Sequence, residues 1–213
     1  MAKIINRIVK VLITSDFFLN LGWGLLSPVF AIFILENIAT QSVSEAAKVA
    51  GFAALFYWIT KSFLEIPIGH FLDKKHGEKD DFWFMVTGTF ITALVPIGYL
   101  FSSFPWHIYF FQVIHAVGMA MTLPSWLAIF TRHIDKGKEA FEWGIATTSI
   151  GAGAGIAGGI GGIVAGIFGF EALFIFVSIF TALSAVLLLF VKDNVFARDK
   201  DGFVIPIKSV VEP

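Results

Sequence analysis

The sequence contains no cysteine and has few charged residues: 15% of its 213 residues are Asp, Glu, Lys or Arg. Without cysteine the chain forms no disulfide, no thiolate metal site and no thiol nucleophile. Soluble domains carry about 25% charged residues. Together with 57% hydrophobic residues and a mean hydropathy of +0.82, the low charge excludes an ordinary soluble domain and indicates an integral membrane protein.

Four long segments of the sequence have no Asp, Glu, Lys or Arg at all. They run over residues 17–35, 82–131, 143–170 and 172–191. A helix needs about 20 apolar residues to cross the hydrocarbon core of a bilayer, so each segment is about long enough. The turn signal Ser102-Ser103-Phe104-Pro105 divides the longest one. We therefore predict six spans, at about 11–35, 47–72, 82–101, 105–131, 139–168 and 170–191.

Lys and Arg are concentrated on one side of these predicted spans. Thirteen of the 15 lie before the first span, between the second and third, between the fourth and fifth, or after the sixth. The positive-inside rule then places both termini in the cytoplasm. The first apolar run carries Asp16 and Asn20 and has no small-residue cleavage site, so we expect no cleaved signal peptide. The expected organisation is a cytoplasmic N-terminus (1–10), a six-helix transmembrane domain (11–191) and a cytoplasmic C-terminal tail (192–213).

A dense charge cluster separates the second and third predicted spans, in the stretch IPIGHFLDKKHGEKDD. Short cytoplasmic loops of membrane proteins are often charged, which is one explanation. The order of the residues favours another, because it resembles the signature between helices 2 and 3 of the major facilitator superfamily. The matching residues are Gly69, Asp73, Lys74, Gly77 and Lys79. One departure is that the second glycine follows the acid by four residues rather than three.

Two further segments resemble the same superfamily. GGIVAGIFGFEALF, residues 161–174, is similar to the junction between its helices 5 and 6, and FQVIHAVGMAMTLPSWLAIF, residues 111–130, is similar to its fourth helix. Members of the superfamily normally have twelve helices in two six-helix halves. The resemblance therefore implies an all-α integral membrane protein that forms half of this fold, with six transmembrane helices arranged as two inverted three-helix repeats.

The fifth predicted span contains the run GAGAGIAGGIGG, with seven glycines and three alanines in twelve residues. A solvated loop does not fit inside a span, because lipid offers no partner for exposed backbone groups. A phosphate-binding loop does not fit either, since no Lys-Ser/Thr pair follows the run. Small residues instead let helix backbones approach closely in lipid. We predict a helix-packing face that comprises Gly151, Gly155, Gly159, Gly161 and Gly162.

Lys61 and Glu65 lie inside the second predicted span. A charged side chain at the bilayer centre costs at least about 2.5–3.5 kcal/mol, so such a residue is a candidate for function. The i, i+4 spacing lets the two residues pair on one helix face, and a purely structural ion pair therefore stands beside a role in transport. Lys61 also gives a weak indication that a transported solute carries an anionic group.

Polar residues form one stripe on each of the first and fourth predicted spans. The stripes are Asp16, Asn20, Trp23 and Ser27 on the first, and Gln112, His115, Met119, Thr122 and Trp126 on the fourth. The resemblance implies that both stripes face a central cavity. His115 alone is more typical of a satisfied interior histidine, and Gln112 stands where many proton-coupled relatives have an arginine. The candidates for binding substrate or protons are Asp16, Asn20, Trp23, Lys61, Glu65, Gln112, His115 and Trp126. Of these, Asp16, Glu65 and His115 are the candidate proton carriers.

Enzyme and nucleic-acid functions find no support in the sequence. It has no H-E-x-x-H or G-x-S-x-G motif, and its basic residues are scattered among acids. We expect no metal and no cofactor. We expect a half-size secondary transporter of the superfamily type, in contact with lipid in the cytoplasmic (inner) cell membrane, that moves a small solute by alternating access. Because this mechanism rocks two halves against each other, we expect a parallel homodimer through spans 1, 2, 4 and 5. The alternatives are a subunit of a split heteromeric transporter and a non-transporting membrane scaffold.

Overall fold

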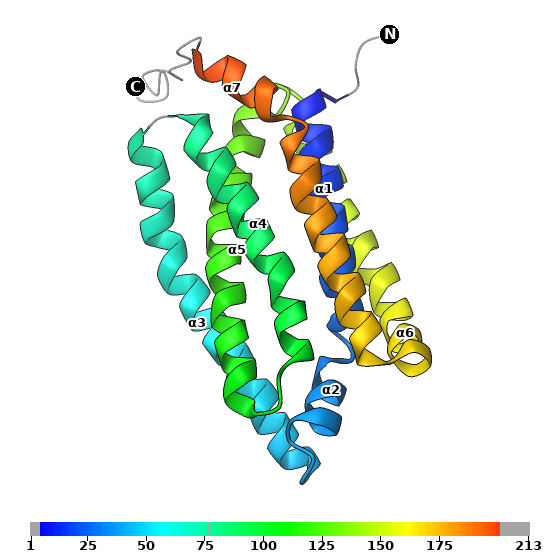
Figure 1. Cartoon of the computed structure of the whole chain (residues 1–213). Coiled ribbons are helices and arrows are strands. Elements are labelled where there is room, and N and C mark those ends of the chain that lie inside the picture. Colours follow the sequence, from blue (N-terminus) through cyan, green and yellow to red (C-terminus); the bar gives the residue numbers. More distant parts are fainter. Residues whose placement is uncertain (1–4, 76, 201–213) are drawn as a thin grey trace.

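The computed structural model describes residues 5–75 and 77–200, and every regular element in these two ranges is a helix (Figure 1). The helices are α1 (Arg7–Leu26), α2 (Phe30–Asn37), α3 (Val43–Lys75), α4 (Glu78–Leu100), α5 (Pro105–His133), α6 (Glu139–Leu189) and α7 (Lys192–Lys200). Five of them, α1, α3, α4, α5 and α6, are long and apolar enough to cross a membrane. The structure therefore agrees with the expected all-α membrane protein.

The first predicted span, 11–35, is divided between two helices. Asn6 starts α1, because its Oδ1 accepts a hydrogen bond from the Val9 N–H at 2.9 Å. The helix ends at Leu26, and Pro28 follows it. Proline has no N–H with which to continue the helical hydrogen bonds, so the chain turns before α2 begins. The single helix expected over this range is thus interrupted near its C-terminal end.

A short connection joins α3 to α4, and complementary charges mark the ends of α4 and α5. Only residues 76 and 77 separate α3 from α4, as expected for a tight turn in the charged stretch. Three acids within Glu78–Asp81 form the first turn of α4, whereas Arg132 and His133 form the last turn of α5. Acids at a helix N-terminus and bases at a C-terminus are both favoured by the helix dipole.

α6 is far too long to cross a bilayer as one straight helix. Its 51 residues would extend about 76 Å at 1.5 Å per residue, more than twice the thickness of a hydrocarbon core. Gly169 interrupts it with φ 79° and ψ 171°, a conformation that a residue with a Cβ adopts only with strain. The chain reverses there, and the two limbs of α6 run back past each other (Figure 1). The reversal falls at the residue predicted to separate the fifth and sixth spans.

α1 packs against both limbs of α6 through small residues. A Cβ on Gly24 would lie 2.9 Å from the Ala157 Cβ, and a Cβ on Gly161 would overlap the Leu25 carbonyl oxygen. On the second limb, a Cβ on Gly22 would lie 3.0 Å from a backbone oxygen. Small residues at these positions therefore let the backbones of α1 and α6 approach closely, as expected in lipid.

Packing within the chain uses a different register from that of most of the predicted glycines. A Cβ added at Gly151, Gly155, Gly159 or Gly162 would meet nothing within 4 Å, so among the five predicted glycines Gly161 alone packs within the chain. The buried small residues of the run are Gly153, Ala157 and Gly161. They have the predicted spacing of four, but start two residues later, about 200° around the helix.

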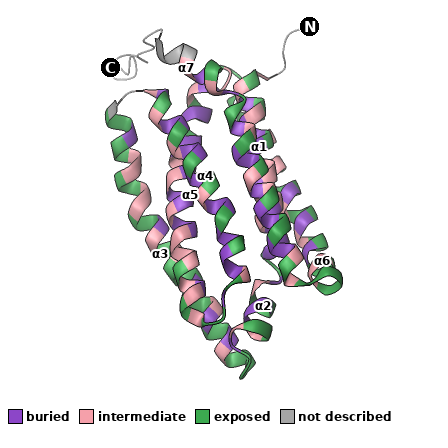
Figure 2. Ribbon diagram, viewed as in Figure 1, coloured by how far each residue is buried: buried purple, intermediate pink, exposed green. Residues whose placement is uncertain are grey.

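α3 stands apart from the rest of the bundle on one side. Only 17% of its most apolar 18 residues are buried, against 44–56% in the other long helices. Figure 2 shows accordingly that most of its length is exposed or half-buried. The exposed residues include large apolar ones such as Phe63 and Ile66. In a membrane protein such a face contacts lipid or another protein.

The predicted C-terminal tail begins with a helix that packs on the start of α4. The Phe196 ring of α7 lies edge-on to the Phe82 ring at a centroid distance of 5.5 Å. The Lys192 Nζ lies 5.2 Å from the centroid of the Trp83 ring. α7 therefore closes the end of the bundle at which the α3–α4 connection lies (Figure 1). The rest of the tail, 201–213, lies outside the described residues.

The loop between α5 and α6 is a short charged turn. Gly137 has a φ of 82°, and the Lys138 N–H donates to the Asp135 carbonyl at 3.0 Å. The Lys138 Nζ also donates to the Asp135 carboxylate at 3.3 Å. This hydrogen bond, together with the positive charge of Lys138, lowers the pKa of the Asp135 carboxyl.

Candidate functional site

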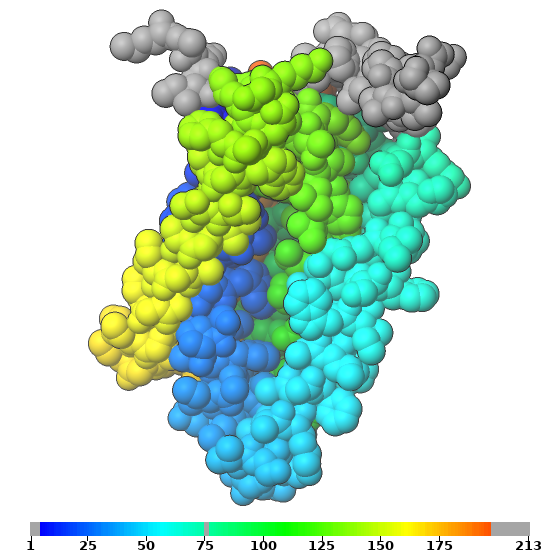
Figure 3. All heavy atoms as spheres, turned by 180° about the vertical axis from the view of Figure 1, so that it is seen from behind, coloured from blue at the N-terminus to red at the C-terminus, as the bar shows by residue number. Residues whose placement is uncertain are grey.

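One face of the bundle is hollowed along its length. Figure 3 shows the hollow between α6 and α1 on one side and α3 on the other, with α5 at its floor. α1, α3 and α5 are the helices that carry most of the polar residues singled out from the sequence. Some of these residues lie where the three helices meet, and the others lie elsewhere in the bundle.

The rings of Trp23 (α1), Tyr57 (α3) and His115 (α5) lie in contact with His115 between the other two. The rings of Trp23 and His115 are stacked, with centroids 3.7 Å apart and planes at 9°. Tyr57 belongs to α3, and its ring centroid lies 4.7 Å from that of His115. The Trp23 Nε1 and the His115 Nδ1 are buried and have no hydrogen-bond partner among the residues that the structure describes. We call Trp23, Tyr57 and His115 the aromatic cluster.

An ion pair continues this cluster along α3. Tyr57, Lys61 and Glu65 occupy successive turns of the helix, and the Lys61 Nζ lies 2.6 Å from a Glu65 carboxylate oxygen, as the i, i+4 spacing predicts. The Lys61 side chain is 9% exposed and the Glu65 side chain 27%. The Lys61 Nζ also lies 5.4 Å from the centroid of the Trp58 ring, within the range of a cation–π interaction. The cation is therefore the more enclosed member of the pair.

Asp16 and Asn20 form a local pair on α1. The Asn20 side-chain amide donates to the Asp16 carbonyl at 2.8 Å and to the Asp16 carboxylate at 3.2 Å. Both residues are half-buried. The amide thus supplies a hydrogen bond to the carboxylate within one turn of the helix. Nothing in the described chain brings this pair into hydrogen-bond contact with the aromatic cluster.

The predicted stripe on α5 does not act as one surface. The Thr122 hydroxyl donates to the Gly118 carbonyl at 2.9 Å, as a residue of the α4–α5 contact. The Trp126 Nε1 donates to the Leu12 carbonyl at 3.4 Å, in a second apolar core. Gln112 is half-buried on α5. Of the predicted α5 residues, His115 is therefore the one that the structure joins to α1 and α3 through ring contacts.

The residues of the charged signature lie at the opposite end of α3 from the α2 connection. Asp73 and Lys74 are exposed, and Asp73 makes no hydrogen bond or ion pair within the described chain. Gly69 would meet nothing within 4 Å if it had a Cβ, and Gly77 caps the start of α4. The Lys79 Nζ lies 5.8 Å from the centroid of the Phe196 ring. The signature thus presents a free carboxylate at this end of the bundle.

A buried charge cluster near this end was missed in the sequence. Asp81 is fully buried and forms an ion pair with Arg132, and the Glu78 carboxylate lies 3.2 Å from the His133 Nε2. Glu142, at the start of α6, is also fully buried. The available signal was the placement of these acids in first helical turns and of the bases in a last turn. These pairs join α4 to α5 and do not contact the aromatic cluster through any described hydrogen bond.

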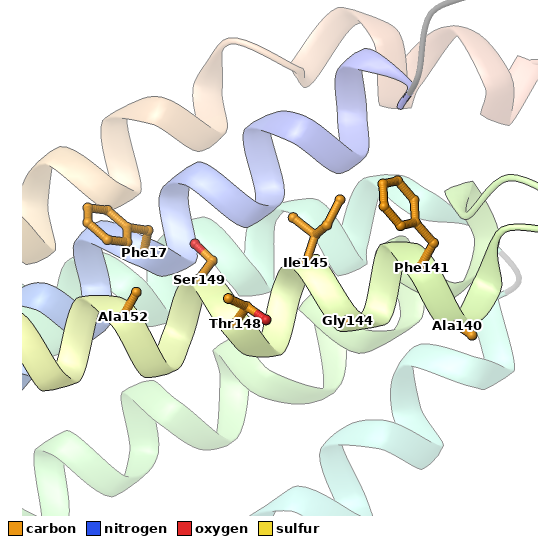
Figure 4. A pocket seen from close by; sticks show the side chains of 8 residues that line it. All are labelled: Phe17, Ala140, Phe141, Gly144, Ile145, Thr148, Ser149 and Ala152. Carbon is orange, nitrogen blue, oxygen red and sulfur yellow. The ribbon is translucent and has the colours of Figure 1, made fainter.

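A recess along the side of α6 is lined by apolar and small residues. Figure 4 shows it between Phe17 of α1 and the α6 face from Ala140 to Ala152. Its polar lining consists of the hydroxyls of Thr148 and Ser149, and it contains no charged side chain. It therefore offers contact area rather than recognition of a charged group.

Comparison with known proteins was consistent with these features. The model of the family described as Major Facilitator Superfamily matches residues 12–209. An uncharacterized MFS-type transporter of Methanocaldococcus jannaschii is 27% identical over 202 residues, which cover 94% of this chain and 50% of that protein. The chain thus spans about half the length of this curated relative.

Proposed function

Because the chain belongs to the major facilitator superfamily, we propose that it moves a small solute across the membrane by alternating access. The observation that carries this proposal is the meeting of α1, α3 and α5 at the aromatic cluster, with the Lys61–Glu65 pair on the next turns of α3. Ionisable groups within a membrane span are costly, so they mark candidate solute or ion pathways. The solute-binding site of this proposal comprises Trp23, Tyr57, Lys61, Glu65 and His115.

The proposed topology has six crossings with both chain termini in the cytoplasm. It counts the two limbs of α6 separately, because each is about as long as a bilayer core requires. The end with the α3–α4 connection, the α5–α6 loop and α7 is the basic end and is assigned to the cytoplasm. The two groups of three crossings would then be the inverted repeats.

Alternating access requires a second six-helix half against the hollow face of Figure 3. We propose a second copy of the chain, related by a two-fold axis along the membrane normal, with contacts through α1, α3, α5 and the first limb of α6. The open faces of Gly151, Gly155 and Gly159 support this arrangement, because they permit close backbone approach from outside the chain. A different six-helix half, as in a split heteromeric transporter, would use the same surface.

Asp73 would serve this mechanism as a latch. Its carboxylate is exposed and lacks a hydrogen-bond partner in the described chain, so it is available to the second half. A helix N-terminus there would favour the carboxylate by about 0.3–1 kcal/mol when exposed. We propose that this contact holds the cytoplasmic side shut.

Transport is tested by reconstituting the protein in vesicles and measuring flux of sugars, organic acids and organic cations. Trp23→Phe should reduce flux because it removes the indole donor that has no partner in the described chain, whereas Trp83→Phe, near the start of α4, should not. The thermal midpoint of both variants reports whether they are folded. A folded protein that moves none of these solutes, and whose thermal midpoint no solute shifts, would instead be the scaffold.

A further inference from the structure

Two groups of the aromatic cluster and its ion pair, the Trp23 indole and the Lys61 ammonium, can only donate hydrogen bonds. The Trp23 indole can only donate, and its Nε1 is buried without an acceptor in the described chain. The His115 Nδ1 is also buried without a partner in the described chain, and an imidazole nitrogen donates or accepts according to its tautomer. The Lys61 ammonium has three donors, and its Nζ forms an ion pair with a Glu65 carboxylate oxygen at 2.6 Å. The site therefore suits a ligand that supplies acceptors.

We propose that this site binds a small carboxylate with a flat apolar body, and that the bound carboxylate replaces Glu65 as the partner of Lys61. This inference rests on the proposed transport function and names the class of solute for its site.

The exchange of partners follows from the unequal exposure of the ion pair. Lys61 is 9% exposed, and a buried cation that loses its partner is strongly destabilising. Glu65 is 27% exposed, so it is the less enclosed member of the pair and can leave Lys61 when a solute carboxylate arrives. Lys61 then keeps an anionic partner throughout. A neutral solute cannot replace Glu65 as the partner of Lys61, because it would have to break the ion pair or bind beside it.

The shape of the solute follows from the rings. The Trp23 and His115 rings stack directly on each other with centroids 3.7 Å apart, so they offer a solute their outer faces and edges, and the Tyr57 ring centroid lies 4.7 Å from that of His115 with the planes at 40°. Aromatic walls of this kind favour a flat apolar group, which they contact by stacking or edge-on. Aromatic rings also bind cations, but the Lys61 ammonium at this site repels them. The combination therefore selects an anionic head with an apolar body.

Binding of radiolabelled benzoate to the full chain in nanodiscs tests the inference, with neutral benzamide as the isosteric competitor. Benzoate should bind at least about tenfold more tightly than benzamide. Glu65→Gln removes the internal competitor and should raise benzoate affinity about tenfold. The matched control is Glu45→Gln, which removes the partner of Lys48 in an exposed α3 ion pair of 2.7 Å and should change nothing.

The double variant Lys61→Met with Glu65→Gln leaves no unpaired buried charge, so it should fold and lose the preference for benzoate. Equal binding of benzoate and benzamide by the parent, or unchanged benzoate affinity in Glu65→Gln, overturns the inference. Flux of other solutes without benzoate binding overturns the carboxylate class and leaves transport standing. Benzoate binding without any solute flux overturns transport and leaves the carboxylate class standing.

Discussion

The close contact of Gly161 with α1 gives the sharpest prediction about stability. A Cβ at this position would overlap the Leu25 carbonyl oxygen and lie 2.8 Å from the carbonyl carbon and 3.0 Å from the Leu25 Cα. All three are backbone atoms, which cannot rotate away, so Gly161→Ala must push α1 and α6 apart. Overpacking of this kind costs about 1–3 kcal/mol. At about 2–4 °C per kcal/mol, the thermal midpoint should fall by several degrees.

Gly166→Ala is the matched control on the same helix, outside the proposed interface of Gly151, Gly155 and Gly159. An added Cβ there meets nothing within 4 Å, and Ala in place of Gly inside a helix stabilises by about 0.5–1 kcal/mol. The two variants should therefore move the thermal midpoint in opposite directions when unfolding is followed by intrinsic fluorescence in detergent. If Gly161→Ala unfolds at or above the temperature of Gly166→Ala, the described register of α1 on α6 is refuted.

Three further predictions concern the charged end of the bundle. Arg132→Met leaves the buried Asp81 carboxylate without its cation and should destabilise the protein by about 3–5 kcal/mol, measured as a lower thermal midpoint; an unchanged midpoint would mean that the pair contributes little. Asp73→Asn should leave the thermal midpoint unchanged, because Asp73 has no hydrogen-bond partner in the described chain, but should increase labelling near the binding site from the cytoplasmic side; equal labelling would contradict the latch. A cysteine at Lys136 should react only with reagents that reach the cytoplasm and one at Ser103 with impermeant reagents outside, and the reverse pattern would invert the topology.

The overall architecture was predictable because the bilayer imposes it. Charge-free runs of sufficient length must become helices, since lipid offers no partner for an unpaired backbone. The reversal at Gly169 was also visible, as a glycine between two apolar runs, and the Lys61–Glu65 pair followed from its spacing. The break before α2 was not predicted. Its signal, Pro28, lies within an apolar run in which every residue also fits a continuous span.

The buried charge cluster was harder to predict because burial depends on which helix ends meet. Asp81 and Arg132 are separated by 50 residues and look like loop residues in the sequence. The positive-inside rule counts the charge of Arg132 but does not indicate what this residue contacts. Once α4 and α5 pack as antiparallel neighbours, the first turn of one meets the last turn of the other, and the pair becomes enclosed.

The register of the glycine run could not be chosen from the sequence, for a reason that bears on assembly. Ten of its twelve residues are Gly or Ala, so every face of the helix is small and the spacing of four recurs in several registers. The packing of α1 determines which register is buried, because its glycines and backbone oxygens contact Ala157 and Gly161. Gly159 then points about 200° away from Gly161, because successive residues turn by about 100°. A run that only served the contact with α1 would need small residues on one face. The second small face, open in the described chain, is therefore the part of the run that packing within the chain does not explain, and it is available to the second half that we propose.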